Sequence, residues 1–229
     1  MYKHFFKRLL DIITSAVAII IFSPLFLILA ILVRTKLGKP ILFAQRRPGK
    51  NMVIKKYYKF RSMTDDTDHH GKLLKDEQRL TKFGLKLRNT SLDELPQLFD
   101  IFLGKMSIVG PRPQTIENIM FMSEEQKRRQ QIMPGLTGWA QVNGRNNTTW
   151  DERVKYDLEY IDKQSFLFDC KIILKTIAMV FKQKDVNQNS KDTDATTFET
   201  MGHYLLRTNQ ITKEEYLIKK TKIEKEYNL

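Results

Sequence analysis

One segment near the N-terminus is long and apolar enough to enter a membrane. Residues 12–33 carry no charge, and most of them are aliphatic or aromatic. Because about 20 apolar residues cross the hydrocarbon core of a bilayer, this pattern predicts a membrane helix. Ser23 and Pro24 lie at its centre, where proline removes a backbone donor and clashes with the carbonyl four residues earlier. Two topologies stay open: a single span kinked at Pro24, and a re-entrant helix hairpin that breaks there and returns.

Both flanks of this segment are basic. The first fifty residues contain nine lysines and arginines and one acid, Asp11. Lysine and arginine are enriched on the cytoplasmic side of membrane helices. Two basic flanks therefore agree with this rule when both ends of the segment stay in the cytoplasm. This distribution fits the re-entrant form, in which the Ser23 hydroxyl would satisfy part of the backbone that Pro24 frees.

The rest of the chain predicts an α+β fold that is mainly helical. Residues 40–45 and 52–60 are rich in strand-forming side chains and enclose Arg-Pro-Gly-Lys, which indicates a small β-hairpin. A later helix is expected to begin after Thr149, because Thr149 and Glu152 have the spacing of a capping box. We expect three segments: a membrane-anchoring helix at 1–36, a central domain at 37–186, and a linker with a small helical tail at 187–229.

Two helical regions have open alternatives. In residues 166–184, Lys171, Lys175 and Lys182 share one stripe. This helix is either amphipathic and interfacial or a core helix whose lysines reach out to solvent. In the tail, residues 205–227 predict a charged helical hairpin. That hairpin is either a solvated helix pair or an interaction surface, with a second copy of the chain as a candidate partner.

Composition narrows the class of partner. Hydrophobic residues make up 41% of the 229 residues, which excludes wholesale disorder. Cys170 is the single cysteine, so an internal disulfide or a zinc site of several thiolates is impossible within one chain. The formal charge of +13 favours a phosphate-bearing partner. Because most of the excess flanks the apolar segment, a membrane surface is favoured over nucleic acid.

Asp93 and Glu94 are candidates for chemistry on a phosphate. Adjacent residues of a helix point about 100° apart, so these carboxylates would serve different tasks, one as nucleophile or base and one as metal ligand. The structural alternative is that Glu94 closes a capping box with Ser91 while Asp93 interacts with the helix dipole. Both interpretations stay open on these residues alone. The polar loop at 64–72 also contains acids and histidines, but it lacks the glycine and glutamate of a calcium loop, which favours a solvated loop over a metal site.

Several basic residues lie beside turns or in short rigid segments, where an arginine fork can bind phosphate oxygens in a fixed direction. Any one of them could equally belong to a solvated basic face. The sequence contains no P-loop, dinucleotide-binding or nucleophile-elbow motif. The basic candidates are Lys59, Arg61, Arg88, Arg112 and Arg145.

A set of motifs in fixed order resembles one known family. They are KRLLD at 7–11, Ser23-Pro24, QRRPG at 45–49, YKFRSM at 58–63, SLDELPQL at 91–98, MSIVGPRP at 106–113 and PGLTGWAQVNGR at 134–145. Together they resemble the bacterial sugar transferases, the small monotopic phosphoglycosyl transferases that load polyprenol phosphate. The resemblance extends from about residue 2 to residue 186 and leaves the tail outside it.

The resemblance implies an enzyme of the bacterial inner membrane that faces the cytoplasm, with a re-entrant helix and interfacial helices around the active site. It would take a UDP-sugar and Mg²⁺, form a phosphosugar on Asp93, release UMP and pass the phosphosugar to polyprenol phosphate. Asp93 would be the nucleophile, and Glu94 would accompany it at Mg²⁺. Membrane lipid is an expected partner and nucleic acid is not. The residues expected to contact phosphate or nucleotide are Lys59, Arg61, Arg88, Pro111, Arg112, Pro113, Gln141 and Arg145.

Two other function classes remain open. A single-span protein with a basic domain could bind nucleic acid through aromatic residues between lysines, for which residues 55–60 are the candidates. A non-catalytic scaffold of polymer export would not need Asp93. Within the transferase interpretation the sugar is open as well, with a UDP-N-acetylhexosamine, UDP-glucose or UDP-galactose as candidates.

Overall fold

The computed structural model describes residues 2–144, 148–186 and 199–227. It is mainly helical with two short two-stranded sheets, which confirms the predicted α+β class. The chain forms two compact units: Met1–Gln45 with Lys56–Ile108, and Arg46–Lys55 with Val109–Leu229. These units divide the chain differently from the three expected segments, because the membrane helix shares a unit with residues 56–108 and the tail belongs to the second unit.

The helices of the first unit include the short turn that carries Asp93 and Glu94. They are η1 (Tyr2–Phe6), α1 (Lys7–Leu37), α2 (Asp76–Arg79), α3 (Lys82–Asn89), η3 (Leu92–Glu94) and α4 (Gln97–Phe102). The helices of the second unit are α5 (Ile116–Phe121), α6 (Glu124–Lys127), η4 (Arg128–Gln131), α7 (Trp139–Asn143), α8 (Trp150–Lys163), α9 (Phe166–Val186), α10 (Met201–Arg207) and α11 (Lys213–Tyr227). Thr149 and Glu152 form the predicted capping box of α8.

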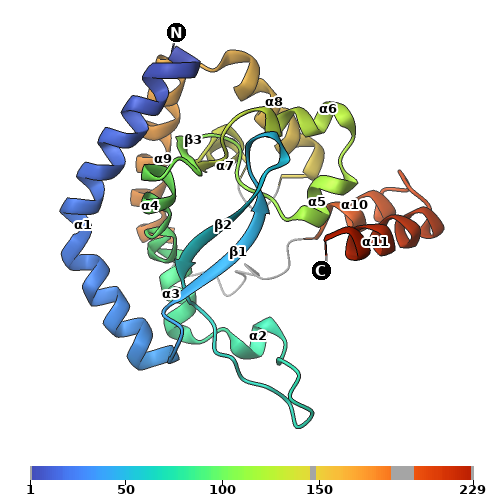
Figure 1. Ribbon diagram of the computed structural model, residues 1–229, viewed down its shortest axis with the longest axis horizontal. Coiled ribbons are helices and arrows are strands. Elements are labelled where there is room, and N and C mark those ends of the chain that lie inside the picture. The colour runs from blue at the N-terminus through green and yellow to red at the C-terminus, as the bar shows by residue number, and fades with distance from the viewer. Residues whose placement is uncertain (1, 145–147, 187–198, 228–229) are drawn as a thin grey trace. The chain divides into compact units, whose positions relative to one another are not determined.

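Helix α1 is the one described helix that is long and apolar enough to cross a membrane. It continues through Pro24, and Figure 1 shows it bent near its middle. The Ser23 hydroxyl donates to the Ile20 carbonyl at 2.8 Å, which is the carbonyl that Pro24 cannot serve. The expected hydrogen bond from Ser23 to the backbone that Pro24 frees is therefore confirmed. In place of the expected break between two helices, α1 is continuous and bent.

Both ends of α1 are fixed within the first unit. Near the start, Arg8 donates to the carbonyls of Ile101 and Phe102 at 2.6 and 2.8 Å, so its guanidinium caps the C-terminal end of α4. Near the other end, one face of the helix packs into an apolar core. The buried residues of that core are Leu29, Val33, Leu37, Phe60 and Leu87. Between these anchors many large apolar side chains of α1 remain exposed.

The expected β-hairpin is present as β1 (Leu42–Pro48) and β2 (Ile54–Phe60). Its tip is the short helix η2 (Lys50–Met52), in which Asn51 and Met52 have positive φ. Both strands pass from the first unit into the second, so the tip belongs to the second unit. Strand β1 extends three residues beyond the expected end at residue 45.

The second sheet was not predicted. It consists of β3 (Ser107–Val109) and β4 (Gly135–Thr137). The pairing continues past β3, where the Gly110 amide donates to the Thr137 carbonyl at 2.9 Å and the Gly135 amide donates to the Pro111 carbonyl at 3.0 Å. A Cβ on Gly110 would lie 2.4 Å from the Met133 carbonyl oxygen, so this close approach requires glycine. Three-residue strands beside glycine and proline carry too little alternation to be recognised in the sequence.

The tail is part of the core of the second unit, so the solvated helix pair is wrong. Helices α10 and α11 lie beside α5 (Figure 1). Met201 is completely buried, and Tyr216 stacks on Phe121 with ring centroids 5.4 Å apart. The Met201 amide also donates to Asn118 at 2.9 Å. The buried apolar residues of the tail thus share a core with residues of α5 and α8, whereas Leu217 and Ile218 are exposed.

Helix α9 is only partly buried. Ile172 is completely buried, whereas Leu167, Leu174 and Ile177 recur on one face at helical spacing and are 78%, 67% and 48% exposed. This contradicts a core helix with only its lysines reaching solvent. The side chain of Lys182 lies outside the described residues.

Candidate active site

Asp93 and Glu94 lie in the tight 3-10 turn η3, between α3 and α4. Ser91, which precedes the turn, has a left-handed backbone with φ 55°, and its side chain caps nothing. The Glu94 amide instead donates to the Ser91 backbone carbonyl at 3.2 Å. The capping-box alternative for Ser91 and Glu94 is therefore wrong, because an N-cap residue needs an extended backbone to aim its hydroxyl at the first turn.

The two carboxylates differ in exposure. Asp93 is 5% exposed, whereas Glu94 is half-buried. A buried carboxylate beside a second acid, in a short turn, is a candidate for chemistry.

Arg88 joins α3, the helix before η3, to the segment that follows β2. Its Nε donates to the Ser62 hydroxyl at 2.8 Å, and Ser62 is buried. The close packing depends on Gly84, since a Cβ there would lie 1.7 Å from the Ser62 carbonyl oxygen. Helix α3 thereby leads directly into the turn with Asp93 and Glu94, and half-buried Arg88 lies at its last turn.

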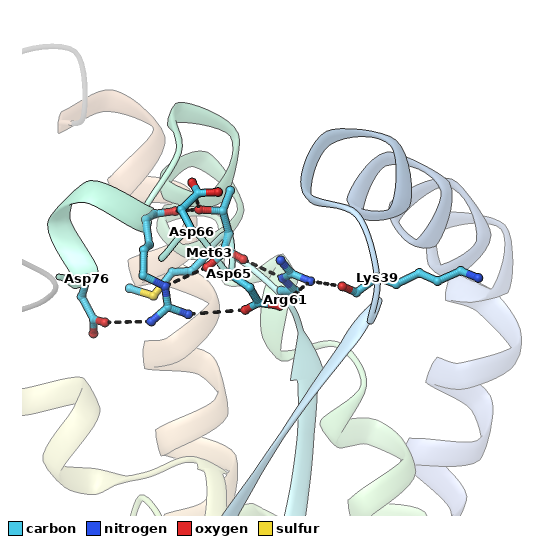
Figure 2. Close-up of polar contacts among 8 residues, drawn as sticks. Lys39, Arg61, Met63, Asp65, Asp66 and Asp76 are labelled. Atoms are coloured by element: carbon cyan, nitrogen blue, oxygen red, sulfur yellow. Dashed lines mark hydrogen bonds and ion pairs between the residues drawn. The ribbon is translucent and has the colours of Figure 1, made fainter. Parts of the chain in front are cut away.

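Arg61 has a structural role in this arrangement (Figure 2). It donates to the carbonyls of Lys39 and Met63, and it pairs with Asp65 at 3.1 Å. Arg79 contacts the same Asp65 at 3.6 Å. Arg61 is buried, so its contacts tie the end of β2 to the segment after α1.

The acids of the 64–72 loop serve the loop itself. Asp66 accepts the Thr64 hydroxyl at 2.5 Å, and Asp68 accepts the backbone amides of His70 and Lys72 at 2.9 and 3.0 Å. Among the residues that the structure describes, no three His, Cys, Asp or Glu side chains gather as a metal site would require. The structure thus favours the solvated loop.

One buried acid of the first unit, Asp100, was missed in the sequence. Asp100, 1% exposed, accepts the Tyr58 amide at 2.9 Å and pairs with Lys105 at 2.8 Å. It thereby joins β2 to α4. An acid on the apolar face of a short helix was the available signal. Lys59, also on β2, lies 5.6 Å from the ring centroid of Phe43.

The remaining candidates belong to the second unit. Pro111 is buried, Pro113 is half-buried and the Arg112 side chain between them is exposed. Gln141 donates to the Leu136 carbonyl at 3.0 Å, while its Oε1 is buried and has no hydrogen-bond partner within the described part of the chain. Arg145 lies outside the described residues.

The segment that carries Gln141 is anchored through Trp139. The Trp139 Nε1 donates to Glu159 at 2.8 Å, and the ammonium groups of Lys171 and Lys175 lie 5.1 and 4.6 Å from its ring centroid. Lys175 also donates to the Asn143 side chain at 2.9 Å. The lysine stripe of α9 therefore fixes α7, which precedes Arg145.

The candidates divide between the two units: Lys59, Arg61, Arg88, Asp93 and Glu94 belong to the first, and Pro111, Arg112, Pro113 and Gln141 to the second. Asp93 and Glu94 fit a Mg²⁺ ion by their chemistry. Mg²⁺ is commonly held by one or two carboxylates while substrate phosphates and waters complete the octahedron. Two adjacent carboxylates with no third acid or histidine gathered beside them, in the described residues, match that mode.

Comparison with known proteins identifies the family. The model of the bacterial sugar transferase family matches residues 2–183. The chain belongs to the bacterial sugar transferases. The match includes η3 and the segments with Arg112 and Gln141, and it ends before α10 and α11.

Individual bacterial sugar transferases agree with this assignment. The chain is 41% identical over 184 residues to the "Uncharacterized sugar transferase EpsL" of Bacillus subtilis (strain 168), covering 80% of this chain and 91% of EpsL. It is 41% identical to the UDP-glucose:undecaprenyl-phosphate glucose-1-phosphate transferase of Klebsiella pneumoniae, covering 78% of this chain and 41% of that protein. It is 36% identical to the UDP-N-acetylgalactosamine-undecaprenyl-phosphate N-acetylgalactosaminephosphotransferase of Aeromonas hydrophila, covering 77% and 44%. The chain thus spans less than half of the latter two proteins.

Proposed function

We propose that this protein transfers a sugar 1-phosphate from a UDP-sugar to polyprenol phosphate at the cytoplasmic face of the bacterial inner membrane, releasing UMP. This would be the first membrane step in assembling a bacterial glycan. The observation that carries the proposal is buried Asp93 beside Glu94, in a turn where neither forms a capping box, within the range that the sugar transferase family matches. Relatives named as undecaprenyl-phosphate transferases support the acceptor and the UDP-sugar donor.

The reaction proceeds in two displacements. A carboxylate oxygen of Asp93 attacks the β-phosphorus of the UDP-sugar, an aspartyl–phosphorus bond forms, and the phosphoanhydride bond breaks so that UMP leaves. An oxygen of polyprenol phosphate then attacks the same phosphorus and displaces Asp93, which regains its carboxylate. Covalent catalysis of this kind divides a transfer between a soluble donor and a lipid acceptor into two simpler steps.

The other residues bind and orient. Asp93 and Glu94 would hold Mg²⁺, which would neutralise charge on the diphosphate. Arg88, Arg112 and Arg145 contact phosphate or nucleotide oxygens, and Lys59 is a further cation for the same oxygens. Pro111 and Pro113 restrict the backbone on either side of Arg112, and Gln141 offers its Oε1 as an acceptor.

Membrane attachment places this chemistry at headgroup depth. Helix α1 enters the bilayer as a re-entrant hairpin bent at Ser23 and Pro24, and both of its ends stay in the cytoplasm. The exposed apolar face of α9 with Leu167, Leu174 and Ile177 lies in the interface, as expected for an amphipathic helix with a basic opposite side.

Intact-protein mass spectrometry after mixing the enzyme with Mg²⁺ and a UDP-sugar, without acceptor, tests the proposal. We expect a mass increase of one phosphosugar, located on Asp93 by peptide mapping and absent from Asp93→Asn, together with UMP release of about one equivalent per enzyme. UMP release that requires both substrates, with no adduct, would instead show direct transfer in a ternary complex. A panel of UDP-sugars in the same experiment identifies the donor.

A further inference from the structure

The backbone of the segment 111–113 is held at every carbonyl. The Pro111 carbonyl accepts the Gly135 amide at 3.0 Å. The Arg112 carbonyl accepts Nη2 of Arg129 at 2.8 Å, and the Pro113 carbonyl accepts Nη1 of Arg47. Each proline fixes its own φ and also restricts the residue before it to an extended backbone. The one exposed side chain in this fixed segment is that of Arg112.

Arg129 is oriented by a buried ion pair. It is 3% exposed, and its partner Asp157 on α8 is 4% exposed. The Arg129 Nε and Nη2 both approach Oδ2 of Asp157, at 2.9 and 2.7 Å. The same Nη2 serves the Arg112 carbonyl. Replacement of a buried ion pair by apolar side chains is often neutral or stabilising, so stability alone explains the Arg129–Asp157 pair poorly. An arginine that donates to Asp157 and to the Arg112 carbonyl at the same time explains the pair directly.

Arg47 approaches the same segment from the β-hairpin. It is half-buried near the end of β1, whereas the preceding Arg46 is exposed. The tip of the hairpin packs against η4, the short helix that carries Arg129. Two arginines from sequence positions 82 residues apart therefore converge on consecutive carbonyls within the second unit.

We propose that Arg129, oriented by Asp157, and Arg47 are positioning residues that fix the backbone of residues 111–113, so that the Arg112 side chain is presented to the phosphates of the nucleotide in one geometry. This inference rests on the proposed function, since it requires Arg112 to contact the nucleotide. When a binding group is already held in its bound geometry, less conformational entropy is lost on binding. Loosening the segment should therefore weaken nucleotide binding without removing any group that touches the nucleotide.

A double-mutant cycle on the full-length protein tests this, with UDP and Mg²⁺ as the probe in isothermal titration calorimetry. Arg129→Lys keeps a charge partner for Asp157, but a single ammonium cannot reproduce the fork that also serves the Arg112 carbonyl. Arg112→Met should weaken UDP binding about tenfold or more, as expected for a lost charge-assisted hydrogen bond. Arg129→Lys should weaken it roughly threefold to tenfold when Arg112 is present and less than about twofold when Arg112→Met is already in place.

Arg128→Met is the matched control, because Arg128 precedes Arg129 and pairs with Glu125 and Asp162 on the surface. It should bind UDP as the wild type does. If Arg129→Lys does not fold, Arg47→Met gives the same cycle while leaving the buried ion pair intact, with Arg46→Met as its control.

Equal weakening by Arg129→Lys with and without Arg112 would overturn the inference, and so would wild-type UDP affinity in Arg129→Lys. If Arg112→Met itself binds UDP normally, Arg112 is no nucleotide contact and the inference fails. The proposed function is tested separately, because the phosphosugar adduct on Asp93 is measured without reference to Arg112.

Discussion

At the scale of residues, the left-handed backbone of Ser91 removes the capping box as an explanation for Glu94. We therefore expect Asp93→Asn to lower turnover by roughly a thousandfold or more, because the nucleophile is lost while the shape is kept. Glu94→Gln should also be severe, and raised Mg²⁺ should restore part of its activity if Glu94 is a ligand. The measurement is UMP release as Mg²⁺ is titrated.

Thermal melts of both variants are the control for that prediction. Because Glu94 closes no capping box, we expect its activity loss to exceed anything that a lower melting temperature can explain. A Glu94→Gln protein that is fully active once it is refolded and stable would contradict a role at the metal.

Asp157 makes the stability of the second unit depend on pH. Burial raises the pKa of Asp157 above its ordinary value of 3.8, and the Arg129 guanidinium only partly offsets this. At pH values between the ordinary pKa of the unfolded chain and the raised pKa of the folded protein, the folded state binds more protons than the unfolded state. The free energy of unfolding therefore falls as pH rises through this window. Asp157→Asn lacks this contribution. Relative to it, the wild type should lose stability from acid toward neutral pH in denaturant titrations, and the opposite trend would show that Arg129 dominates.

Individual residues were predictable where their signal is local. The Thr149–Glu152 capping box was predicted correctly because its spacing is fixed, whereas Asp93 and Glu94 were chosen as candidates because they are adjacent. Ser91 has the same spacing to Glu94, but only the chain geometry after α3 makes its backbone left-handed. The hydrogen bond from Arg61 to the Lys39 carbonyl and the pairing of Arg129 with Asp157 are contacts between residues far apart in the sequence. A local sequence pattern does not predict such contacts.

At the scale of elements, helices with a strong period or cap were predicted and short strands were not. Helix α8 and the hairpin of β1 and β2 follow from local patterns. Strands β3 and β4 depend on backbone pairing between residues near 109 and 136, where glycine and proline suppress the alternation of side chains. The tail was interpreted as charged because few of its residues are apolar, although several of those few, among them Met201, Tyr204 and Tyr216, are buried in the core.

Because the tail packs into the core of the second unit, we expect the enzyme to need residues 199–229 for its stability. Deletion should expose Phe121 and Trp150 and lower the melting temperature of the enzyme. Gly202→Ala is a gentler test, because its Cβ would lie 2.8 Å from the Tyr216 ring and 3.0 Å from the Phe121 ring. Overpacking of this kind costs about 1–3 kcal/mol. Chemical denaturation of the full-length variant measures that loss.

Ile218→Ser is the matched control for Gly202→Ala, since Ile218 on α11 is 69% exposed. We expect it to leave the unfolding free energy within about 0.5 kcal/mol of the wild type. A deletion variant that melts like the full-length protein would show that the tail is dispensable to the fold after all.

At the scale of the whole molecule, the chain combines one described helix that is long and apolar enough to cross a membrane with basic residues on both sides of it. This helix, α1, contains Pro24 and is bent near its middle (Figure 1). Residues near both ends of α1 contact segments of the first unit, through Arg8 at one end and Leu37 at the other. If the two ends of α1 lay on opposite faces of a membrane, they could not both contact the same folded unit. Contacts of both ends with the first unit therefore favour ends on the same face.

We therefore predict that the N-terminus and the residues after α1 lie on the cytoplasmic side. The single cysteine, Cys170, is first replaced by alanine, and Lys3→Cys and Lys36→Cys then report on either side of α1. Neither position should react with a membrane-impermeant maleimide in intact cells, and both should react after the membrane is opened. Labelling of Lys3→Cys from outside would show a true span. Pro24→Ala restores the missing backbone donor, so it should favour a straighter helix and increase outside labelling at Lys3→Cys, while Lys36→Cys stays protected and serves as the internal control.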